Sequence, residues 1–431
     1  MKKNLSLLMA VLLGLAWYVT ISSWVGNDSK YQDYIAEAER LEEKELYLDA
    51  IDAYESAKEL KPDNLEVEER IADIYFAMGN HKEYRRQLDA IIDKYGPVEA
   101  DVTKAYEFYR DYSSEDSLIN YVAKLYEEYP DSTLVKEYYN SIKGIYTEMY
   151  MSYDDIGTFF GKTATYEQGG KKGLLNVDGN IVVEAVYDDI IYNGTDADRI
   201  TVKDGSKYYF INNNGYKTKE PEEAFDYLGM FSSKRIVARK EGKYGYLDSS
   251  LKEKLGFIYD EASAFREDIA AVKKDDKWAL INTKGEELTE YVYDDVALNS
   301  GGYCSVNSVV WVKQGSEWFL IDKTGERIGE NTYQDVKAFE SSQPCAVCRN
   351  EMWGFADTAG NMVIDGMYQD AKSYANGFAP VKNNGLWGYI DLENYLAVEF
   401  AFGDARQMTA GGVAPIAHGN TWTLIELKAI N

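Results

Sequence analysis

The sequence predicts a multidomain α+β protein with an N-terminal transmembrane helix, a region of helical repeats and a long all-β repeat array. Three observations predict this arrangement. An uncharged apolar stretch lies within residues 1–26, apolar residues recur at helical spacing over residues 27–150, and a strand-like motif recurs over residues 160–431. At about 150 residues per domain, a chain of 431 residues has room for several domains.

The composition narrows the possible classes of function. The chain has 73 acidic and 46 basic residues and a formal net charge of −27. Nucleic acids and anionic lipids attract basic patches, so this balance argues against both as partners. Three cysteines and two histidines are too few for a disulfide scaffold or for a zinc site built from several such ligands.

Residues 1–26 have the pattern of a transmembrane signal-anchor. Lys2 and Lys3 precede the apolar stretch Leu5–Val25, and about 20 helical residues are enough to span the hydrocarbon core of a membrane. The two lysines favour a cytoplasmic N-terminus, which places the rest of the chain outside the cytoplasm. The alternative is a cleaved signal peptide and a secreted protein, because the strongest apolar run, Leu7–Val19, is short.

Residues 27–150 are predicted to form paired helices. A proline ends each pair, because it cannot donate a backbone hydrogen bond to a continuing helix. The prolines at positions 62, 97 and 130 are 35 and 33 residues apart, and Gly79 falls where a turn between two helices is expected. In the clearest copy, small and aromatic residues follow helical spacing; they are Tyr47, Ala50, Ile51, Tyr54 and Ala57.

This spacing resembles the tetratricopeptide repeat, whose period is about 34 residues. The resemblance implies a stack of helical hairpins with a concave groove of the kind that holds a peptide. Residues 25–150 contain 30 acidic and 15 basic residues, so a partner in this groove is expected to be basic or neutral.

A motif of about 35 residues recurs eight times in residues 160–431. Each copy combines a short apolar strand, a turn, a strand with an aromatic-glycine-aromatic pattern and a strand rich in Val and Ile. The position before that glycine, here named the Trp slot, is occupied by Lys172, Tyr208, Tyr244, Trp278, Trp318, Trp353, Trp387 and Trp422. Eight occurrences separated by 34 to 40 residues indicate one repeated structural unit.

The repeated unit is predicted to stack on its neighbours, because a single hairpin cannot bury its aromatic face. The glycine after the Trp slot is expected to make room for an aromatic ring of a neighbouring unit. An Asp or Asn with a downstream glycine is expected to close the turn after the Trp-slot strand. Examples are Asp178-Gly179, Asn282 with Gly285, Asp322 with Gly325, and Asp357 with Gly360.

The motif resembles the WG-repeat family, which is named for a Trp-Gly pair. Trp353-Gly354 and Trp387-Gly388 match that pair outright. Other copies keep one residue of the pair or neither; they are Lys172-Gly173, Tyr208-Tyr209, Tyr244-Gly245, Trp278-Ala279, Trp318-Phe319 and Trp422-Thr423. The resemblance implies an interaction module of the kind found in bacterial, often exported proteins, without an assigned reaction.

Two architectures fit a β array of this kind. Seven to eight units of this length form either a propeller-like ring, which is the preferred prediction, or an open β superhelix. The final copy stops after its second strand, at Glu426, so it either supplies strands that close a ring or acts as a terminal cap.

No catalytic, cofactor-binding or metal-binding residues are predicted. Cys345 and Cys348 lie three apart in a strand of the repeat, where they face opposite sides, so they are interpreted as structural. His81 and His418 have no nucleophile motif nearby.

Two acidic patterns are also given structural interpretations. Asp188-Asp189 and Asp294-Asp295 follow a tyrosine at the same phase of the repeat, which indicates turn residues rather than a catalytic carboxylate pair. Asn193, Asp196 and Asp198 form only a partial calcium-loop pattern and are interpreted as a surface loop.

These patterns predict a non-enzymatic, membrane-anchored extracytoplasmic protein-interaction or scaffold protein with no cofactor. A protein or peptide partner is expected, and the sequence does not identify the ligand-binding residues. A cell-envelope polysaccharide-binding module is the alternative, because 37 tyrosines and the Trp row offer rings for stacking on sugars. An envelope hydrolase is the third hypothesis.

Overall fold

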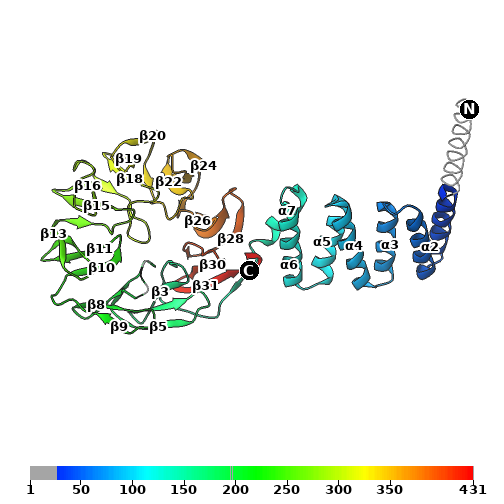
Figure 1. Cartoon of the computed structure of the whole chain (residues 1–431), viewed down its shortest axis with the longest axis horizontal. Coiled ribbons are helices and arrows are strands. Elements are labelled where there is room, and N and C mark those ends of the chain that lie inside the picture. The colour runs from blue at the N-terminus through cyan, green and yellow to red at the C-terminus, as the bar shows by residue number, and fades with distance from the viewer. Residues whose placement is uncertain (1–26, 195, 197, 431) are drawn as a thin grey trace, which may run out of the picture. The chain divides into compact units, whose positions relative to one another are not determined.

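The computed structural model describes residues 27–430, with residues 195 and 197 left out. It divides into two units, Met1–Ile142 and Lys143–Asn431, and Figure 1 shows the helices of the first and the strands of the second. Within the described residues, no helix is both long enough and apolar enough to cross a membrane. The anchor predicted over residues 1–26 lies outside the described part of the chain.

The first unit consists of consecutive helices joined by short turns. They are a helix over residues 27–42, α2 (Tyr47–Leu60), α3 (Leu65–Ala77), α4 (His81–Tyr95), α5 (Glu99–Tyr112), α6 (Glu115–Glu128) and α7 (Thr133–Ile142). Pro62, Pro97 and Pro130 follow α2, α4 and α6, as the spacing predicts. Gly79, with a φ of 71°, lies in the turn between α3 and α4. The paired helices are present, and their assignment to the tetratricopeptide family stays a prediction.

Burial within this unit follows the helical pattern in the sequence. Ala50 and Ala57 are fully buried on α2, and their small side chains allow close contact with a neighbouring helix. Tyr54 lies between them in the same core cluster and donates a hydrogen bond to Glu42. Asn64 caps α3 by accepting a hydrogen bond from the Val67 amide at 3.3 Å.

The second unit is a ring of eight four-stranded blades, except that the outermost strand of blade 4 is reduced to isolated bridges. Figure 1 shows the last strands, in red, beside the first blades, in green. Blade 1 contains β2 (Asp155–Ile156), β3 (Thr163–Gln168), β4 (Lys171–Asn176) and β5 (Ile181–Tyr187), and blade 2 contains β6 (Asp189–Ile191), β7 (Ile200–Asp204), β8 (Lys207–Ile211) and β9 (Lys217–Lys219). Blade 3 contains β10 (Tyr227–Ser232), β11 (Arg235–Lys240), β12 (Lys243–Leu247) and β13 (Glu253–Tyr259), and blade 4 contains β14 (Glu261–Ala262), β15 (Ile269–Lys274) and β16 (Lys277–Asn282).

Blades 5 to 8 repeat the same order of strands. Blade 5 contains β17 (Asp295–Val296), β18 (Val309–Gln314), β19 (Glu317–Asp322) and β20 (Arg327–Tyr333), and blade 6 contains β21 (Asp335–Val336), β22 (Cys345–Arg349), β23 (Met352–Ala356) and β24 (Met362–Tyr368). Blade 7 contains β25 (Asp370–Ala371), β26 (Phe378–Asn383), β27 (Leu386–Asp391) and β28 (Leu396–Phe402), and blade 8 contains β29 (Asp404–Ala405), β30 (Val413–His418) and β31 (Thr421–Leu427).

The ring is closed by a strand that precedes the first blade in sequence. β1 (Tyr146–Glu148) completes blade 8 by pairing with β31, with Thr147 opposite Glu426. The Met149 amide extends this pairing by donating to the Leu424 carbonyl at 2.8 Å. The predicted propeller-like ring is therefore confirmed, and the open superhelix is excluded. The helical region predicted to reach residue 150 ends at Ile142, because the residues of β1 pair with the β ring instead.

The Trp slot lies on the third strand of each blade, and its Trp residues are buried. Trp387 pairs with Phe402 on β28 and is 4% exposed. Its core cluster includes Met408 and Ile416 of blade 8, so the ring packs against the next repeat as predicted. All five Trp residues of the slot are buried; they are Trp278, Trp318, Trp353, Trp387 and Trp422.

The glycine after the Trp slot serves a different purpose from the one predicted. A Cβ atom at Gly388 would lie 2.5 Å from the Val398 carbonyl oxygen, and one at Gly354 would lie 2.3 Å from the Ile364 carbonyl oxygen. Both carbonyls belong to the outer strand of the same blade, where the pairing register shifts. The glycine therefore admits a backbone irregularity, and the expected contact with a ring of a neighbouring unit was wrong.

The turns after the Trp-slot strand follow the predicted chemistry. The Asp357 carboxylate accepts hydrogen bonds from the amides of Ala359 and Asn361, and the Gly360 amide donates to the Asp357 carbonyl. Blade 1 differs from the prediction, because Asn176 rather than Asp178 accepts the equivalent hydrogen bonds.

Candidate functional site

A polar pocket of about 420 Å³ is the main candidate site of the β unit. Residues from all eight blades line it, so it lies on the axis of the ring. They come chiefly from the segments between the first and second strands of each blade, such as residues 157–162 in blade 1 and 297–308 in blade 5. These segments vary in length, for example from six residues in blade 1 to twelve in blade 5, and such variation is typical of loops that carry specificity on a regular scaffold.

The lining of this axial pocket is rich in amide and hydroxyl groups. The amide side chains are Asn193, Asn299, Asn376 and Gln407, and the hydroxyl side chains are Thr158, Ser232, Ser300, Tyr303 and Ser341. Phe160 adds a partly exposed ring, and Arg266 and Glu340 are the two charged residues. The pocket is therefore suited to a polar ligand that exchanges several hydrogen bonds.

Arg266 is held against the ring of Tyr303, with the guanidinium 5.3 Å from the ring centre. Tyr303 is fixed by Asn193, whose side-chain amide lies 2.6 Å from the Tyr303 hydroxyl. Among the residues that the structure describes, the Arg266 guanidinium has no hydrogen bond or ion pair. Its donors are consequently available to a ligand in the axial pocket.

Glu340 lies in the same pocket, but its carboxylate is already hydrogen bonded. The Ser300 amide and hydroxyl donate to it at 3.0 and 2.6 Å. Burial raises the pKa of Glu340, while the Ser300 hydrogen bonds and the charge of Arg266 act in the opposite direction.

A second cavity of about 430 Å³ continues from the axial pocket along the channel. The two share five lining residues; these are Thr158, Asn299, Ser300, Glu340 and Gln407. Lys337, Lys372 and Arg406 line this second cavity from blades 6, 7 and 8, each directly after the first strand of its blade.

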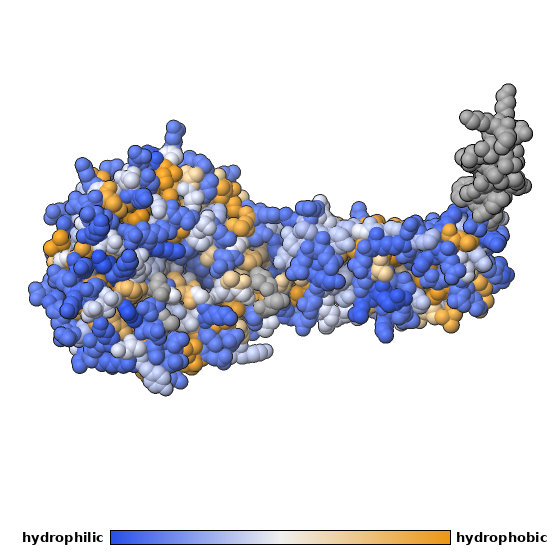
Figure 2. All heavy atoms as spheres, viewed as in Figure 1, coloured by the Kyte–Doolittle hydropathy of each residue, from blue (hydrophilic) through white to orange (hydrophobic). Residues whose placement is uncertain are grey.

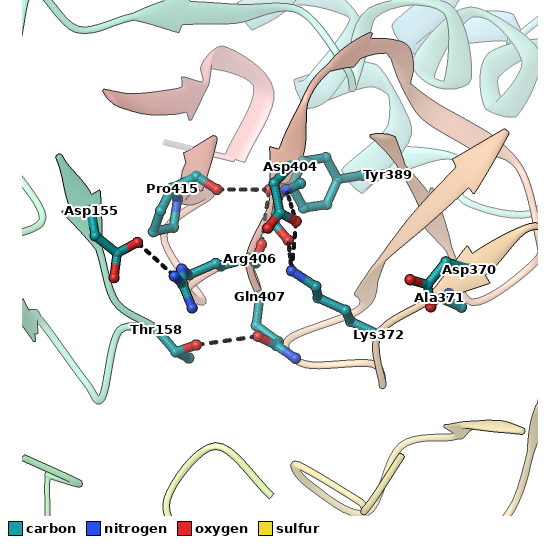
Figure 3. Close-up of polar contacts among 11 residues, drawn as sticks. Asp155, Thr158, Asp370, Ala371, Lys372, Tyr389, Asp404, Arg406, Gln407 and Pro415 are labelled. Atoms are coloured by element: carbon teal, nitrogen blue, oxygen red, sulfur yellow. Dashed lines mark hydrogen bonds and ion pairs between the residues drawn. The ribbon is translucent and has the colours of Figure 1, made fainter. Parts of the chain in front are cut away.

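Two of these cations join neighbouring blades, as Figure 3 shows. Lys372 donates to the Asp404 carboxylate and to the Ala405 carbonyl, both at 2.7 Å, and thereby links blade 7 to blade 8. Arg406 lies 2.6 Å from the Asp155 carboxylate and links blade 8 to blade 1. Burial lowers the pKa of Lys372, and Asp404 opposes that shift. Both side chains are therefore used to hold the ring together around its closure.

Lys337 differs from Lys372 and Arg406. Its ammonium lies 4.9 Å from the centre of the Trp353 ring. Over the described ranges it forms no ion pair, and its side chain is exposed. Lys337 is thus a second cation of the channel that is available to a ligand.

The carboxylate pairs identified in the sequence lie in separate blades and have structural partners. Asp188 contacts Lys171 at 2.6 Å and accepts a hydrogen bond from the Gly205 amide, which lies in a hairpin turn of blade 2. Asp294 has the same arrangement with Lys277 and Gly315. The pKa values of both carboxyls are lowered, chiefly by the hydrogen bonds from these lysines. Their interpretation as turn residues agrees with these contacts.

The cysteines are buried free thiols. Cys345 and Cys348 on β22 belong to different core clusters, which agrees with the predicted opposite orientation. The Trp311 indole donates to Cys345 at 3.1 Å, and burial raises the pKa of both thiols. His418 is exposed on β30 and lies 3.2 Å from Glu148.

The residues of the partial calcium pattern, Asn193, Asp196 and Asp198, form hydrogen bonds within the protein. Asp196 accepts a hydrogen bond from the Asp198 amide, and Asn193 is directed to Tyr303. Among the described residues, no group of three or more His, Cys, Asp or Glu side chains could hold a metal ion.

The helical unit has an exposed aromatic patch that the sequence analysis did not identify. The patch consists of the exposed rings of Phe76 and Tyr112 and the partly exposed ring of His81, from α3, α5 and α4, and the buried ring of Phe108 lies beneath them. His81 lies 4.8 Å from Tyr112 and 5.8 Å from Phe76, measured between ring centres. Tyr112 is 54% exposed and Phe76 is 38% exposed. The face of the helical unit that Figure 2 shows is mainly hydrophilic.

An acidic cavity of about 530 Å³ also lies in the helical unit. Residues from the helix 27–42, from the start of α2 and from α3 line it. The acidic ones are Glu39, Glu42, Glu43, Glu45 and Asp73, and Arg70 is the one cation among the lining residues. This placement agrees with the negative charge that the sequence assigns to the helical repeats.

Comparison with known proteins identifies the repeated unit. Residues 173–208, 244–278, 279–318 and 353–387 match the family model described as WG containing repeat. The predicted resemblance is thus confirmed at four repeats. No curated protein matches the chain.

Several solved structures are weakly similar. The Neurospora crassa Pan2 WD40 domain is 10% identical, with 54% of this chain and 86% of that chain covered and a TM-score of 0.32. The AfRom2 CNH domain is 7% identical, with coverages of 65% and 97% and a TM-score of 0.36. BBS1N in complex with ARL6DN is 11% identical, with coverages of 66% and 98% and a TM-score of 0.33. TM-scores this low do not define a common fold, so the propeller assignment depends on the strand pairings.

Proposed function

We propose that this protein is a protein-interaction scaffold in which two repeat units present binding surfaces. Repeat arrays of this kind offer extended surfaces for binding, and four stretches of the β unit match the WG-repeat model. The observation that carries the proposal is the aromatic patch of the helical unit, because exposed aromatic residues are enriched at the centres of protein interfaces.

The aromatic patch is better suited to a protein than to a sugar. Its two exposed rings, Phe76 and Tyr112, meet edge-on with their centres 5.6 Å apart, so they form one continuous aromatic surface. The polysaccharide hypothesis relied in part on the Trp row, and the five Trp residues of that row are buried in the propeller. That hypothesis therefore has less support than a protein partner.

The charge of the helical unit sets the expected chemistry of the partner. With 29 acidic and 14 basic residues over 25–142, and an acidic cavity beside α3, this unit favours a neutral or basic protein surface. A non-enzymatic role is part of the proposal, and the structural uses of the Asp pairs and the buried cysteines support it.

The proposed location is extracytoplasmic, with residues 1–26 as a retained membrane anchor. The charge pattern of Lys2 and Lys3 supports this orientation. Secretion after removal of a signal peptide is the alternative, and N-terminal sequencing of the mature protein distinguishes the two.

The combined substitution Phe76→Ala and Tyr112→Ala should reduce capture of partners at least tenfold without unfolding the chain. The two rings are the most exposed of the patch, so their removal deletes interface area while the buried core remains. The measurement is chemical crosslinking in intact cells followed by quantitative mass spectrometry of proteins recovered with the full chain.

Tyr34→Ala is the matched control, because Tyr34 is a similarly exposed aromatic residue of the same unit, at 40%, outside the patch. Equal recovery with the double variant and with the parent chain would contradict the patch as the binding surface. Recovery of no specific protein with the parent chain would contradict the scaffold function itself.

A further inference from the structure

The channel of the propeller contains two cations that have no carboxylate partner among the described residues, Arg266 and Lys337. Four cations, Arg266, Lys337, Lys372 and Arg406, line the two continuous cavities, against the two acids Asp295 and Glu340. The whole chain has a net charge of −27. Lys372 forms an ion pair with Asp404, and Arg406 forms one with Asp155. In the described part of the chain, Arg266 and Lys337 have no carboxylate partner.

Two acidic residues close to Arg266, Glu267 and Glu340, already accept hydrogen bonds from other residues. Glu267, its neighbour in sequence, accepts hydrogen bonds from Ser305, Asn307 and Ser308 of blade 5 at 2.7 to 2.9 Å. Glu340 is held by Ser300. Neither carboxylate forms an ion pair with Arg266, so the hydrogen-bond donors of its guanidinium are left for a ligand.

Arg266 is also held in position before any ligand arrives. Its backbone amide and carbonyl are both hydrogen bonded to Ile269, at 3.0 and 2.9 Å. Phe265, the preceding residue, is 1% exposed, and the Tyr303 ring supports the guanidinium. A fixed guanidinium loses little freedom on binding, and its planar fork matches a carboxylate with two parallel hydrogen bonds.

Two amide side chains elsewhere in the lining of the axial pocket fit a peptide backbone. Asn376 donates its side-chain amide to the Met408 carbonyl, which leaves its oxygen to accept a hydrogen bond. Gln407 accepts from Thr158 through its oxygen, which leaves its nitrogen to donate. One acceptor and one donor are the complement of a peptide N–H and C=O. Because loops from all eight blades surround the pocket, a chain end can enter it more easily than the middle of a chain.

We propose that the axial pocket binds the carboxyl-terminal end of a peptide, with Arg266 binding the terminal carboxylate and Lys337 adding positive charge further along the channel. This inference rests on the proposed protein-binding function and assigns it a second site, separate from the aromatic patch. A carboxylated saccharide offers the same anionic group, so the experiment includes one as a separate arm.

The test measures binding of fluorescein-labelled peptides to the full chain by fluorescence anisotropy. The probe is a mixture of random hexapeptides with free carboxyl termini, and the comparison is the same mixture with amidated termini. The free-acid mixture should bind at least tenfold more tightly than the amidated one. Arg266→Gln should remove this difference and leave binding of the amidated mixture unchanged.

Arg239→Gln is the matched control. Arg239 also lies over a tyrosine ring, 5.7 Å from the centre of Tyr244, but it is exposed on β11 and lines neither axial cavity. This substitution should leave the binding of both mixtures unchanged. The third arm is a trimer of galacturonic acid, which should bind at least tenfold more weakly than the free-acid peptides.

Three results would overturn the proposal: equal binding of acid and amide, no effect of Arg266→Gln, or no peptide binding up to about 1 mM. Binding of the galacturonate trimer through Arg266, without peptide binding, would also overturn it and would assign the pocket to an acidic saccharide. If partner capture depends on Phe76 and Tyr112 but not on Arg266, that result supports the scaffold function and contradicts the proposed carboxylate-binding site.

Discussion

Replacing Trp387 with alanine should lower the free energy of unfolding of the β unit by about 3–5 kcal/mol, as for other large aromatic side chains removed from a core. The ring is 4% exposed and packs with Met408 and Ile416 of the next blade. The cavity left behind would therefore weaken blade 7 and its contact with blade 8. Urea unfolding followed by tryptophan fluorescence measures this change, because every Trp beyond residue 26 lies in the β unit.

Tyr216→Ala is the control for this loss of an aromatic ring, because Tyr216 is 71% exposed in the same unit. It should change the free energy of unfolding by less than about 0.5 kcal/mol. A Trp387→Ala variant as stable as its parent would mean that the slot residues do not hold neighbouring blades together.

Gly388→Ala should destabilise the β unit by about 1–3 kcal/mol, although it adds a single methyl group. The new Cβ would lie 2.5 Å from the Val398 carbonyl oxygen and 3.0 Å from the Glu399 carbonyl carbon. Because both atoms are backbone, the outer strand must move away and strain its pairing with β27. The same unfolding assay measures the effect.

Gly411→Ala is matched to this substitution, because nothing lies within 4 Å of a Cβ atom at Gly411. The control should leave stability close to that of the parent chain. If Gly388→Ala behaves in the same way, the glycine of the repeat is not required by the close approach of the outer strand.

The sequence predicted those features of the fold that repeat. The Trp slot recurs eight times, and each occurrence lies on the third strand of a blade. The sequence did not predict the closing strand β1. Its three residues, Tyr146–Glu148, are separated from the other copies of the repeat and come directly after the helical region. Its role depends on pairing with β31, far away in the sequence.

The candidate binding residues were harder to predict for a related reason. Arg266 lies in a segment between strands that differs from blade to blade, so the repeat period carries no information about its role. Arg266 has no ion pair because Glu267 and Glu340 bind other residues, and only the tertiary structure shows those contacts. The rings of the aromatic patch come from three helices, so their proximity depends on how α3, α4 and α5 pack together.

Closure of the β ring is the central claim, because an axial pocket lined by all eight blades exists only in a closed ring. The most direct test is oxidation of a chain that carries both Thr147→Cys and Glu426→Cys, followed by mass spectrometry of its proteolytic peptides. These two positions face each other across β1 and β31, at a separation suited to a disulfide. The closed ring predicts an intramolecular disulfide between positions 147 and 426 in most molecules. Its absence, or links between separate molecules alone, would contradict the ring and indicate an open array.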